Sequence, residues 1–199
     1  EADRTRANNY YVGAVNGGVG TDPNIPFSTS SIINRLVMNN PADPTDVSFD
    51  MVIDLADANT GLGYSLTHIR GIASLDDGNL IVAEQETRSL YSVELDGNGD
   101  FVSIAKIFDL DAAFDSDNTG VYFQPFNVIY NEYTDKINYV ERNMTAGDGT
   151  SRIVEINLDG TGHNVLLDGV KAGALFVVPA PTTLALLGLG GLAATRRRR

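Results

Sequence analysis

None of the 199 residues is cysteine, and this absence excludes disulfides, thiolate metal sites and cysteine nucleophiles. Histidine is almost absent as well. The two histidines, His68 and His163, are far apart in the sequence, and neither has a second histidine or a cysteine at metal-ligand spacing. Because an isolated histidine is more often structural than catalytic, we interpret both as structural or surface residues. The side chains that most often carry metal or nucleophilic chemistry are therefore scarce.

Positive charge is also sparse. The chain has 14 basic and 26 acidic residues, and its last four positions are all arginine. Residues 1–195 therefore carry 10 basic and 26 acidic side chains, a net charge of −16. Such a surface repels nucleic acid and anionic lipid, and it attracts cations and basic partners. We expect no nucleic-acid partner.

Helical periodicity is missing from the chain before its C-terminal tail. In its place the sequence shows the two-residue alternation of half-buried strands. Ser89–Asp96 and Arg152–Asp159 show it most clearly, with apolar and polar residues on opposite faces. Each stretch is followed directly by glycine, so that it ends in an Asp-Gly pair suited to a tight hairpin turn with positive φ. The pattern predicts antiparallel hairpins.

The predicted strands recur in sets of four, which indicates an internal repeat. The first complete set is Gly71–Ser74, Leu80–Gln85, Ser89–Asp96 and Phe101–Leu110. The second is Phe126–Tyr130, Lys136–Arg142, Arg152–Asp159 and His163–Asp168. A degraded upstream set comprises Tyr10–Val15, Ser30–Asn39 and a strand at Val52–Leu55. In the two complete sets Glu84 aligns with Glu141, 57 residues later.

Four-stranded antiparallel units at this spacing predict an all-β protein built from the blades of a β-propeller, with a β-sandwich as the alternative. We expect this region to span residues 1–177. Ala174–Val178 is a candidate first strand that would join the upstream set. Propellers usually have four to eight blades, so about three blades predict a partial propeller. It is either the C-terminal portion of a longer chain or part of a ring that an oligomer completes.

The second complete set resembles a blade of the YWTD/NHL-like propellers. Its strand at Lys136–Glu141 is followed by Arg152–Leu167, which contains the Leu-Asp-Gly hairpin typical of that family. Asn138–Glu141 stands where the family has Tyr-Trp-Thr-Asp, and the chain has no tryptophan. The resemblance implies the fold and leaves the function open.

Carboxylates are the main candidates for a metal site. Asp115, Asp117 and Gly120 belong to an acidic, glycine-ended loop whose density of oxygen ligands suits Ca²⁺. A second oxygen-rich turn runs from Asp96 to Asp100. The alternative for both is an ordinary solvated turn in an acidic protein. No other cofactor is expected.

Glu84, Glu141 and Asn127 allow one enzymatic hypothesis. In lactonase-like propeller hydrolases, residues of these types gather around one divalent metal at the central channel. Glutamate at equivalent positions of two sets indicates either a repeated channel position or a polar residue at the solvent edge. Our leading hypothesis is a protein without enzymatic activity, and a metal-dependent, lactonase-like hydrolase is the alternative.

The chain ends in a tail of different composition, with no acidic residue after Asp168. The tail, residues 178–199, opens with a proline-bounded motif of Val178, Pro179, Ala180 and Pro181. An apolar stretch follows, and the 14 residues from Thr182 to Thr195 predict a short helix of about 21 Å. That is less than the roughly 20 residues of a full membrane span. The tail closes with Arg196, Arg197, Arg198 and Arg199.

These three parts, in this order, resemble the PEP-CTERM sorting signal of Gram-negative bacteria, with Ala180 in place of the glutamate of the motif. The resemblance implies export by an N-terminal signal and transient anchoring in the inner membrane through the C-terminal helix. It also implies processing near the proline motif by an exosortase, a membrane enzyme, and release to the cell envelope or the extracellular space. We therefore expect an exported, surface-sorted β-propeller that binds an extracellular polysaccharide or protein, or that forms part of the extracellular matrix.

Overall fold

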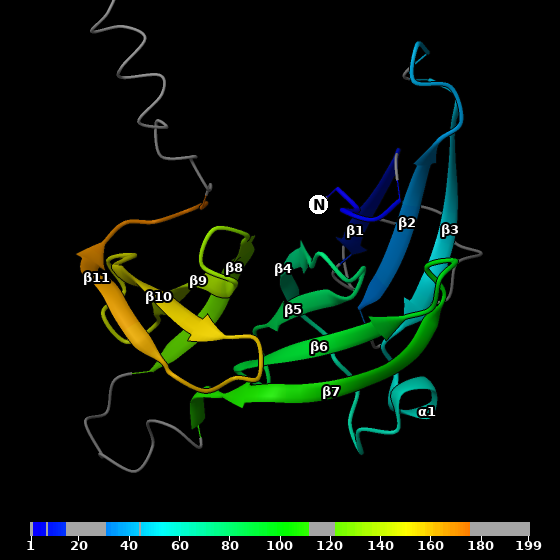
Figure 1. Ribbon diagram of the computed structural model, residues 1–199. Coiled ribbons are helices and arrows are strands. Elements are labelled where there is room, and N and C mark those ends of the chain that lie inside the picture. Colours follow the sequence, from blue (N-terminus) through cyan, green and yellow to red (C-terminus); the bar gives the residue numbers. More distant parts are fainter. Residues whose placement is uncertain (1, 7, 15–30, 44, 112–121, 176–199) are drawn as a thin grey trace, which may run out of the picture.

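The described part of the chain contains eleven β-strands and one four-residue helix. The structure is a computed structural model, and it describes residues 2–6, 8–14, 31–43, 45–111 and 122–175. The strands form three antiparallel sheets in the orders β1-β2-β3, β4-β5-β6-β7 and β8-β9-β10-β11, which we call the N-terminal, middle and C-terminal sheets. Figure 1 shows the middle sheet between the other two. The all-β prediction is confirmed, and the predicted C-terminal helix lies outside the described residues.

The N-terminal sheet is the degraded set that the sequence predicts. Its strands are β1 (Asn9–Ala14), β2 (Ile32–Met38) and β3 (Val47–Asp54). A single helical turn, α1 (Asp57–Thr60), follows β3 and has no counterpart in the predicted pattern. Four residues are too few to show a helical period, so sequence periodicity could not reveal it.

The expected strand at Ala174–Val178 is wrong in its described part. Ala174 and Leu175 lie in no strand, and residues 176–178 are outside the described ranges. The Leu175 amide donates to Asn127 Oδ1 at 3.2 Å, which ties this segment to the C-terminal sheet and not to the N-terminal sheet. Among the described residues, the N-terminal sheet therefore has three strands.

The two complete sets are confirmed as four-stranded sheets. The middle sheet consists of β4 (Ile69–Ser74), β5 (Leu80–Glu84), β6 (Ser89–Leu95) and β7 (Phe101–Asp109). The C-terminal sheet consists of β8 (Phe123–Asn131), β9 (Lys136–Asn143), β10 (Ser151–Asn157) and β11 (Asn164–Val170). In each sheet every strand pairs with the next along the chain, as blades of a propeller require.

Both faces of the middle sheet carry buried residues, and two separate cores result. The core against the N-terminal sheet includes Tyr11, Ile33, Ile53, Leu80, Val82, Tyr91 and Val93. The core against the C-terminal sheet includes Ile81, Ala83, Leu90, Val128, Tyr139, Val154 and Ile156. All five residues of β5 are buried, in keeping with its unbroken apolar run, which is typical of a strand covered on both sides.

The first strands of the three sheets, β1, β4 and β8, lie next to one another, since β4 contacts both β1 and β8. Gly71 of β4 makes this approach possible. A Cβ atom at position 71 would lie 2.8 Å from the backbone nitrogen of Val128 in β8, closer than real Cβ atoms come. The backbones of β4 and β8 therefore approach each other closely at Gly71, because no side chain lies between them there.

The hairpin between β10 and β11 also packs against the middle sheet. Gly160, from the Asp-Gly pair of this turn, has a φ of 83°, as the sequence predicts. A Cβ atom there would lie 1.8 Å from the carbonyl oxygen of Ile107 in β7. In the matching turn between β6 and β7 the positive φ falls on Gly99, at 84°, and not on Gly97 of the Asp-Gly pair.

Residues 2–6, the N-terminal segment, cross from one sheet to the next at the turns. Arg4 Nη1 binds Glu132 Oε2 in the β8–β9 turn at 2.7 Å and Asp76 Oδ1 in the β4–β5 turn at 3.3 Å. The Arg4 guanidinium also lies over the ring of Tyr130, 5.1 Å from its centre. Arg6 donates to the carbonyl oxygen of Asp96 at 2.5 Å, in the β6–β7 turn. The segment thus joins turns of the middle and C-terminal sheets.

Asp3 holds the N-terminal segment in place. Its side chain is fully buried and accepts hydrogen bonds from Arg6 Nη1 at 2.8 Å, the Tyr11 hydroxyl at 3.0 Å and the Thr5 amide at 2.8 Å. Burial raises the pKa of Asp3, but the hydrogen bonds from Arg6 and Thr5 outweigh it and hold the pKa below its ordinary value of 3.8. Burial and the bond to Asp3 raise the pKa of Tyr11 to about 12.

Asp3→Asn is expected to lower the free energy of unfolding by about 1–3 kcal/mol at neutral pH, because a buried acceptor loses its charge and part of its bonding capacity. The pKa of Asp3 is lowered by folding, so its contribution is present above the ordinary pKa and is lost as the pH falls through the folded value. The variant should therefore lose less stability in acid than the wild type. Chemical denaturation at pH 7 and through the acid range measures both effects.

The matched control is Asp168→Asn, on the exposed edge strand β11. It is expected to leave the unfolding free energy and its pH dependence close to those of the wild type. Equal effects of the two substitutions would contradict the role assigned to Asp3.

Candidate functional site

The two repeated glutamates occupy the same place in their sheets, on the second strand of each. Glu84 is the last residue of β5, and Glu141 lies near the end of β9. Both side chains are fully buried. Neither lines an open channel or a solvent edge, which are the two positions that the sequence suggested. The repeat is real, but it places both carboxylates in the interior.

Glu84 binds backbone groups on either side of it. Its Oε1 accepts hydrogen bonds from the amides of Thr67 at 3.2 Å and His68 at 2.7 Å. Its Oε2 accepts from the amide and the hydroxyl of Thr87, at 2.6 and 2.7 Å. The carboxylate thereby fixes the segment that leads into β4 and the turn between β5 and β6. A buried carboxylate with this many donors is satisfied by structure alone.

The partners of Glu141 are side chains, whereas those of Glu84 are mainly backbone amides. Its Oε1 accepts from the Tyr139 hydroxyl at 2.5 Å and from His163 Nε2 at 2.8 Å, and its Oε2 pairs with Arg152. Burial, together with the charge of Glu141, raises the pKa of Tyr139 well above its ordinary value. The Arg152 guanidinium lies over the ring of Phe123 at 3.8 Å. We call Glu141, Tyr139, Arg152 and His163 the Glu141 cluster.

His163 links the Glu141 cluster to the middle sheet. Its ring stacks on Phe108 of β7, with the two ring centres 5.4 Å apart. The ring of Tyr139 meets the same Phe108 edge-on, at 6.4 Å. His163 therefore contacts both the C-terminal sheet, through Glu141, and the middle sheet, through Phe108. Its partner Glu141 lies 22 residues earlier, so no local spacing could have revealed the contact.

The principal calcium candidates, Asp115, Asp117 and Gly120, lie outside the described residues. Their neighbour Asp111 is described, and it pairs with Arg88. Within the described ranges, no group of three or more His, Asp or Glu side chains is placed to hold a metal ion. Asn127 is also accounted for, since its Oδ1 accepts the Leu175 amide. Glu84, Glu141 and Asn127 thus each have hydrogen-bond partners within the protein.

Arginine binds the second oxygen-rich turn, Asp96–Asp100. Arg35 Nη1 donates to the carbonyl oxygen of Asn98 at 2.5 Å, and Arg6 binds the carbonyl oxygens of Asp96 and Gly97. Bonds from the backbone amides of Asp100 and Asn98 lower the pKa of Asp96. The oxygen atoms that suggested calcium are thus engaged by two guanidinium groups and by the turn itself.

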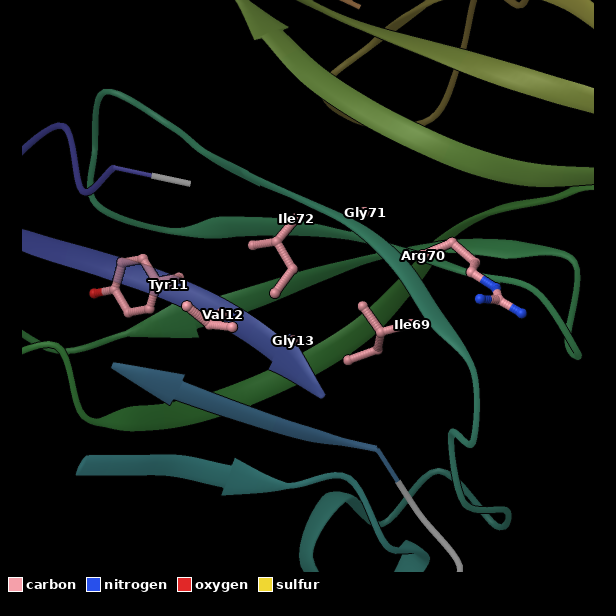
Figure 2. A pocket seen from close by; sticks show the side chains of 7 residues that line it. All are labelled: Tyr11, Val12, Gly13, Ile69, Arg70, Gly71 and Ile72. Carbon is pink, nitrogen blue, oxygen red and sulfur yellow. The ribbon is translucent and has the colours of Figure 1, made fainter. Parts of the chain in front are cut away.

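A cavity of about 280 Å³ lies between the first strands of the N-terminal and middle sheets. Its lining residues are Tyr11, Val12, Gly13, Ile69, Arg70, Gly71 and Ile72, shown in Figure 2. The side chains at its walls are mainly aliphatic, and Arg70 points away from Tyr11 and Ile72. The Tyr11 hydroxyl is bound to Asp3. The lining residues of the cavity include no carboxylate and no histidine for acid–base chemistry.

Phe126 of β8 lies near this cavity's arginine and was not identified from the sequence. The guanidinium groups of Arg70 and Arg142 both lie over its ring, at 5.9 and 5.5 Å. Arg70 Nε also donates to Gln85 Oε1 at 2.5 Å. These residues come from β4, β8 and β9, so only the tertiary structure brings them together. In an acidic protein they form a small concentration of positive charge.

The tail has a known counterpart. Residues 177–199 match the PEP-CTERM protein-sorting motif. The match implies recognition by an exosortase and sorting on export to the cell envelope of a Gram-negative bacterium. It covers the tail alone and does not assign the strands that precede it to a family. Among the described residues, no helix is long and apolar enough to cross a membrane.

A comparison with curated proteins gives no match. Among solved structures, the chain is similar to a luciferin-regenerating enzyme (14% identity, TM-score 0.49, covering 82% of this chain and 43% of that one). It is also similar to a chain of a nidogen/laminin complex, with 16% identity and a TM-score of 0.49, covering 80% of this chain and 44% of that one. A third similar structure is the PQQ-bound aldose sugar dehydrogenase of Streptomyces coelicolor, with 14% identity and a TM-score of 0.39, covering 55% of this chain and 32% of that one. The chain spans less than half the length of each of these three structures.

Glu84→Gln and Glu141→Gln are each expected to lower the free energy of unfolding by about 1–3 kcal/mol, because each leaves buried donors without a charged acceptor. Chemical denaturation measures the loss, with the exposed Glu94→Gln as the matched control. The hydrolase hypothesis makes the opposite prediction, because a metal ligand would lose bound metal and hydrolytic activity with little change in stability. Metal content measured on the same samples decides between them.

Proposed function

We propose that the protein is exported and sorted to the cell surface, where its β-sheet region binds an extracellular polysaccharide or protein or serves as a component of the extracellular matrix. The match of residues 177–199 to the PEP-CTERM motif carries the proposal, because that motif implies exosortase-dependent sorting. The sheets end at Val170, before the motif begins. The sorting segment and the folded region are thus separate along the chain.

Binding, and not catalysis, is the role that we assign to the sheets. In support, the repeated carboxylates of Glu84 and Glu141 are each engaged by donors of the surrounding structure. The cavity between β1 and β4 is small and mainly aliphatic. The net charge of −16 over residues 1–195 favours a basic partner, or a polysaccharide bridged by cations.

The tail is proposed to act before release. Thr182–Thr195 would hold the protein in the inner membrane, with the terminal arginines on the cytoplasmic side as the positive-inside rule requires. The exosortase would then process the chain near Pro179 and Pro181. In this proposal the change from glutamate to Ala180 leaves recognition intact, since the apolar stretch and the arginine end are both retained.

The mature protein is expected to lack Arg196–Arg199 when it is produced in a host with an exosortase. Intact-mass spectrometry of the surface fraction measures this directly. Replacing all four arginines by alanine should leave unprocessed protein in the membrane fraction, because the orientation signal is lost. Ala180→Glu is the matched control, and it should be processed at least as fully as the wild type.

Retention of Arg196–Arg199 in the surface fraction would overturn the proposed processing. Processing of the Ala180→Glu variant alone would show that the Pro-Ala-Pro motif is not recognised. Neither result depends on what the β-sheet region binds.

A further inference from the structure

The two central rows of the outer face of the N-terminal sheet are mainly apolar and carry no charge. In the strand register, Tyr10 pairs with Leu36 and Leu36 with Phe49, and the next row on this face is Val12, Asn34 and Met51. Phe49 and Met51 are each 64% exposed, and Val12 is 44% exposed. None of these six residues is charged, although 20% of the chain is. Exposed apolar surface of this kind marks an interaction site.

The internal repeat shows what this face packs against in the other two sheets. In the middle sheet the corresponding face carries Leu80, Val82, Tyr91 and Val93, which are buried against the N-terminal sheet. In the C-terminal sheet the equivalent positions, 57 or 63 residues later, are Ile137, Tyr139, Val154 and Ile156, which are buried against the middle sheet. The middle and C-terminal sheets thus each bury this face against the sheet that precedes them in the chain. We call it the preceding-side face. The N-terminal sheet has a preceding-side face too, but among the described residues no other sheet packs against it.

The occupant must offer the opposite kind of face, which we call the following-side face. In the N-terminal and middle sheets this face is already used in the two cores. In the C-terminal sheet it points away from the middle sheet and carries the row Val140, Ile153 and Leu167, in which Val140 is already buried and Ile153 half-buried within one copy. Leu167 is 51% exposed. In the described part of the chain, this following-side face is not covered by another sheet.

We propose that two copies of this chain form a two-fold dimer in which the N-terminal sheet of each copy packs on the C-terminal sheet of the other. Each contact continues the stacking that already joins the three sheets of one copy, with the usual spacing of about 10 Å between sheets. Because the two contacts are reciprocal, the dimer closes and does not grow into a fibre. Six sheets then surround one axis, a number within the range of known propellers.

Charge favours the same pair of surfaces. Two copies with a net charge of −16 over residues 1–195 repel each other over most of their surface. On the preceding-side face of the N-terminal sheet the rows of Leu36 and Asn34 carry no charge, and Asp54 lies beyond them in the row of Ile32. On the C-terminal sheet Lys136 and Glu155 pair with each other at 2.8 Å, and Arg142, two residues from Val140 on the same face, lies over the ring of Phe126. The other charges near the two faces are Asp54 on the N-terminal sheet and Arg142 on the C-terminal sheet, and they are of opposite sign.

Sedimentation equilibrium of the full chain is expected to give twice the 21.3 kDa mass of one copy. Phe49→Lys on the N-terminal sheet and Leu167→Glu on the C-terminal sheet should each halve the measured mass. Both positions are exposed, so the fold is expected to survive, and circular dichroism checks this. Val102→Lys, at a 52% exposed position of the middle sheet, is the matched control and should keep the mass of the wild type.

Mixing the two variants provides the sharper test. In a mixed pair, one contact brings the lysine introduced at position 49 of one copy to the glutamate introduced at position 167 of the other. The second contact is wild type on both sides. Equimolar Phe49→Lys and Leu167→Glu should therefore recover the double mass that neither has alone.

Three results would each overturn the proposal: a wild type of single mass, a dissociating Val102→Lys variant, or a Leu167→Glu variant that stays dimeric. The last result would instead indicate pairing of two N-terminal sheets. Association through the tail would survive every substitution.

Discussion

Burial of both faces of the middle sheet is the constraint on which the arrangement of the other sheets depends. Its second strand, β5, has no exposed residue, and its two faces supply two distinct cores. Each fully buried aliphatic or aromatic side chain contributes about 1.5–3 kcal/mol, so the separation of either neighbouring sheet would expose several such side chains at once. Gly71 and Gly160 set how closely the C-terminal sheet approaches, because backbone atoms of the neighbouring sheet occupy the space of a side chain. The three sheets therefore behave as one stack.

The buried glutamates show how a repeat can preserve a residue type while changing its partners. Glu84 accepts bonds mainly from backbone amides, whereas Glu141 is surrounded by a tyrosine, an arginine and a histidine. Removing a carboxylate from water is costly, and in both places the cost is offset by charged or polar donors. The shared function is to fix the end of the second strand to the segments beside it. Equivalent residues in the two repeats thus contact different kinds of partner.

Period-two alternation is clearest in β6 and β10, where apolar and polar residues alternate and Asp-Gly pairs mark the ends, whereas β5 is buried on both faces and does not alternate. The N-terminal sheet was recognised from weaker signals, and α1 was missed because four residues have no measurable period. The contacts of Glu141, Phe126 and Asp3 could not be predicted, since their partners come from other strands or other sheets. The same limit applies to the turn at Asp96–Asp100: its oxygens are evident from the sequence, but the arginines that bind them come from residues 6 and 35.

The bonds of the N-terminal segment bear on the order in which the chain folds during export. Arg4 meets Asp76 and Glu132, which are 72 and 128 residues further along the chain. If the chain emerges from the membrane with its N-terminus first, Arg4 is outside long before the β8–β9 turn that binds it. The segment can reach its final position only after β8 and the β8–β9 turn have also crossed. Residues 2–6 would thus cross before the turns that they join and dock only after those turns have arrived.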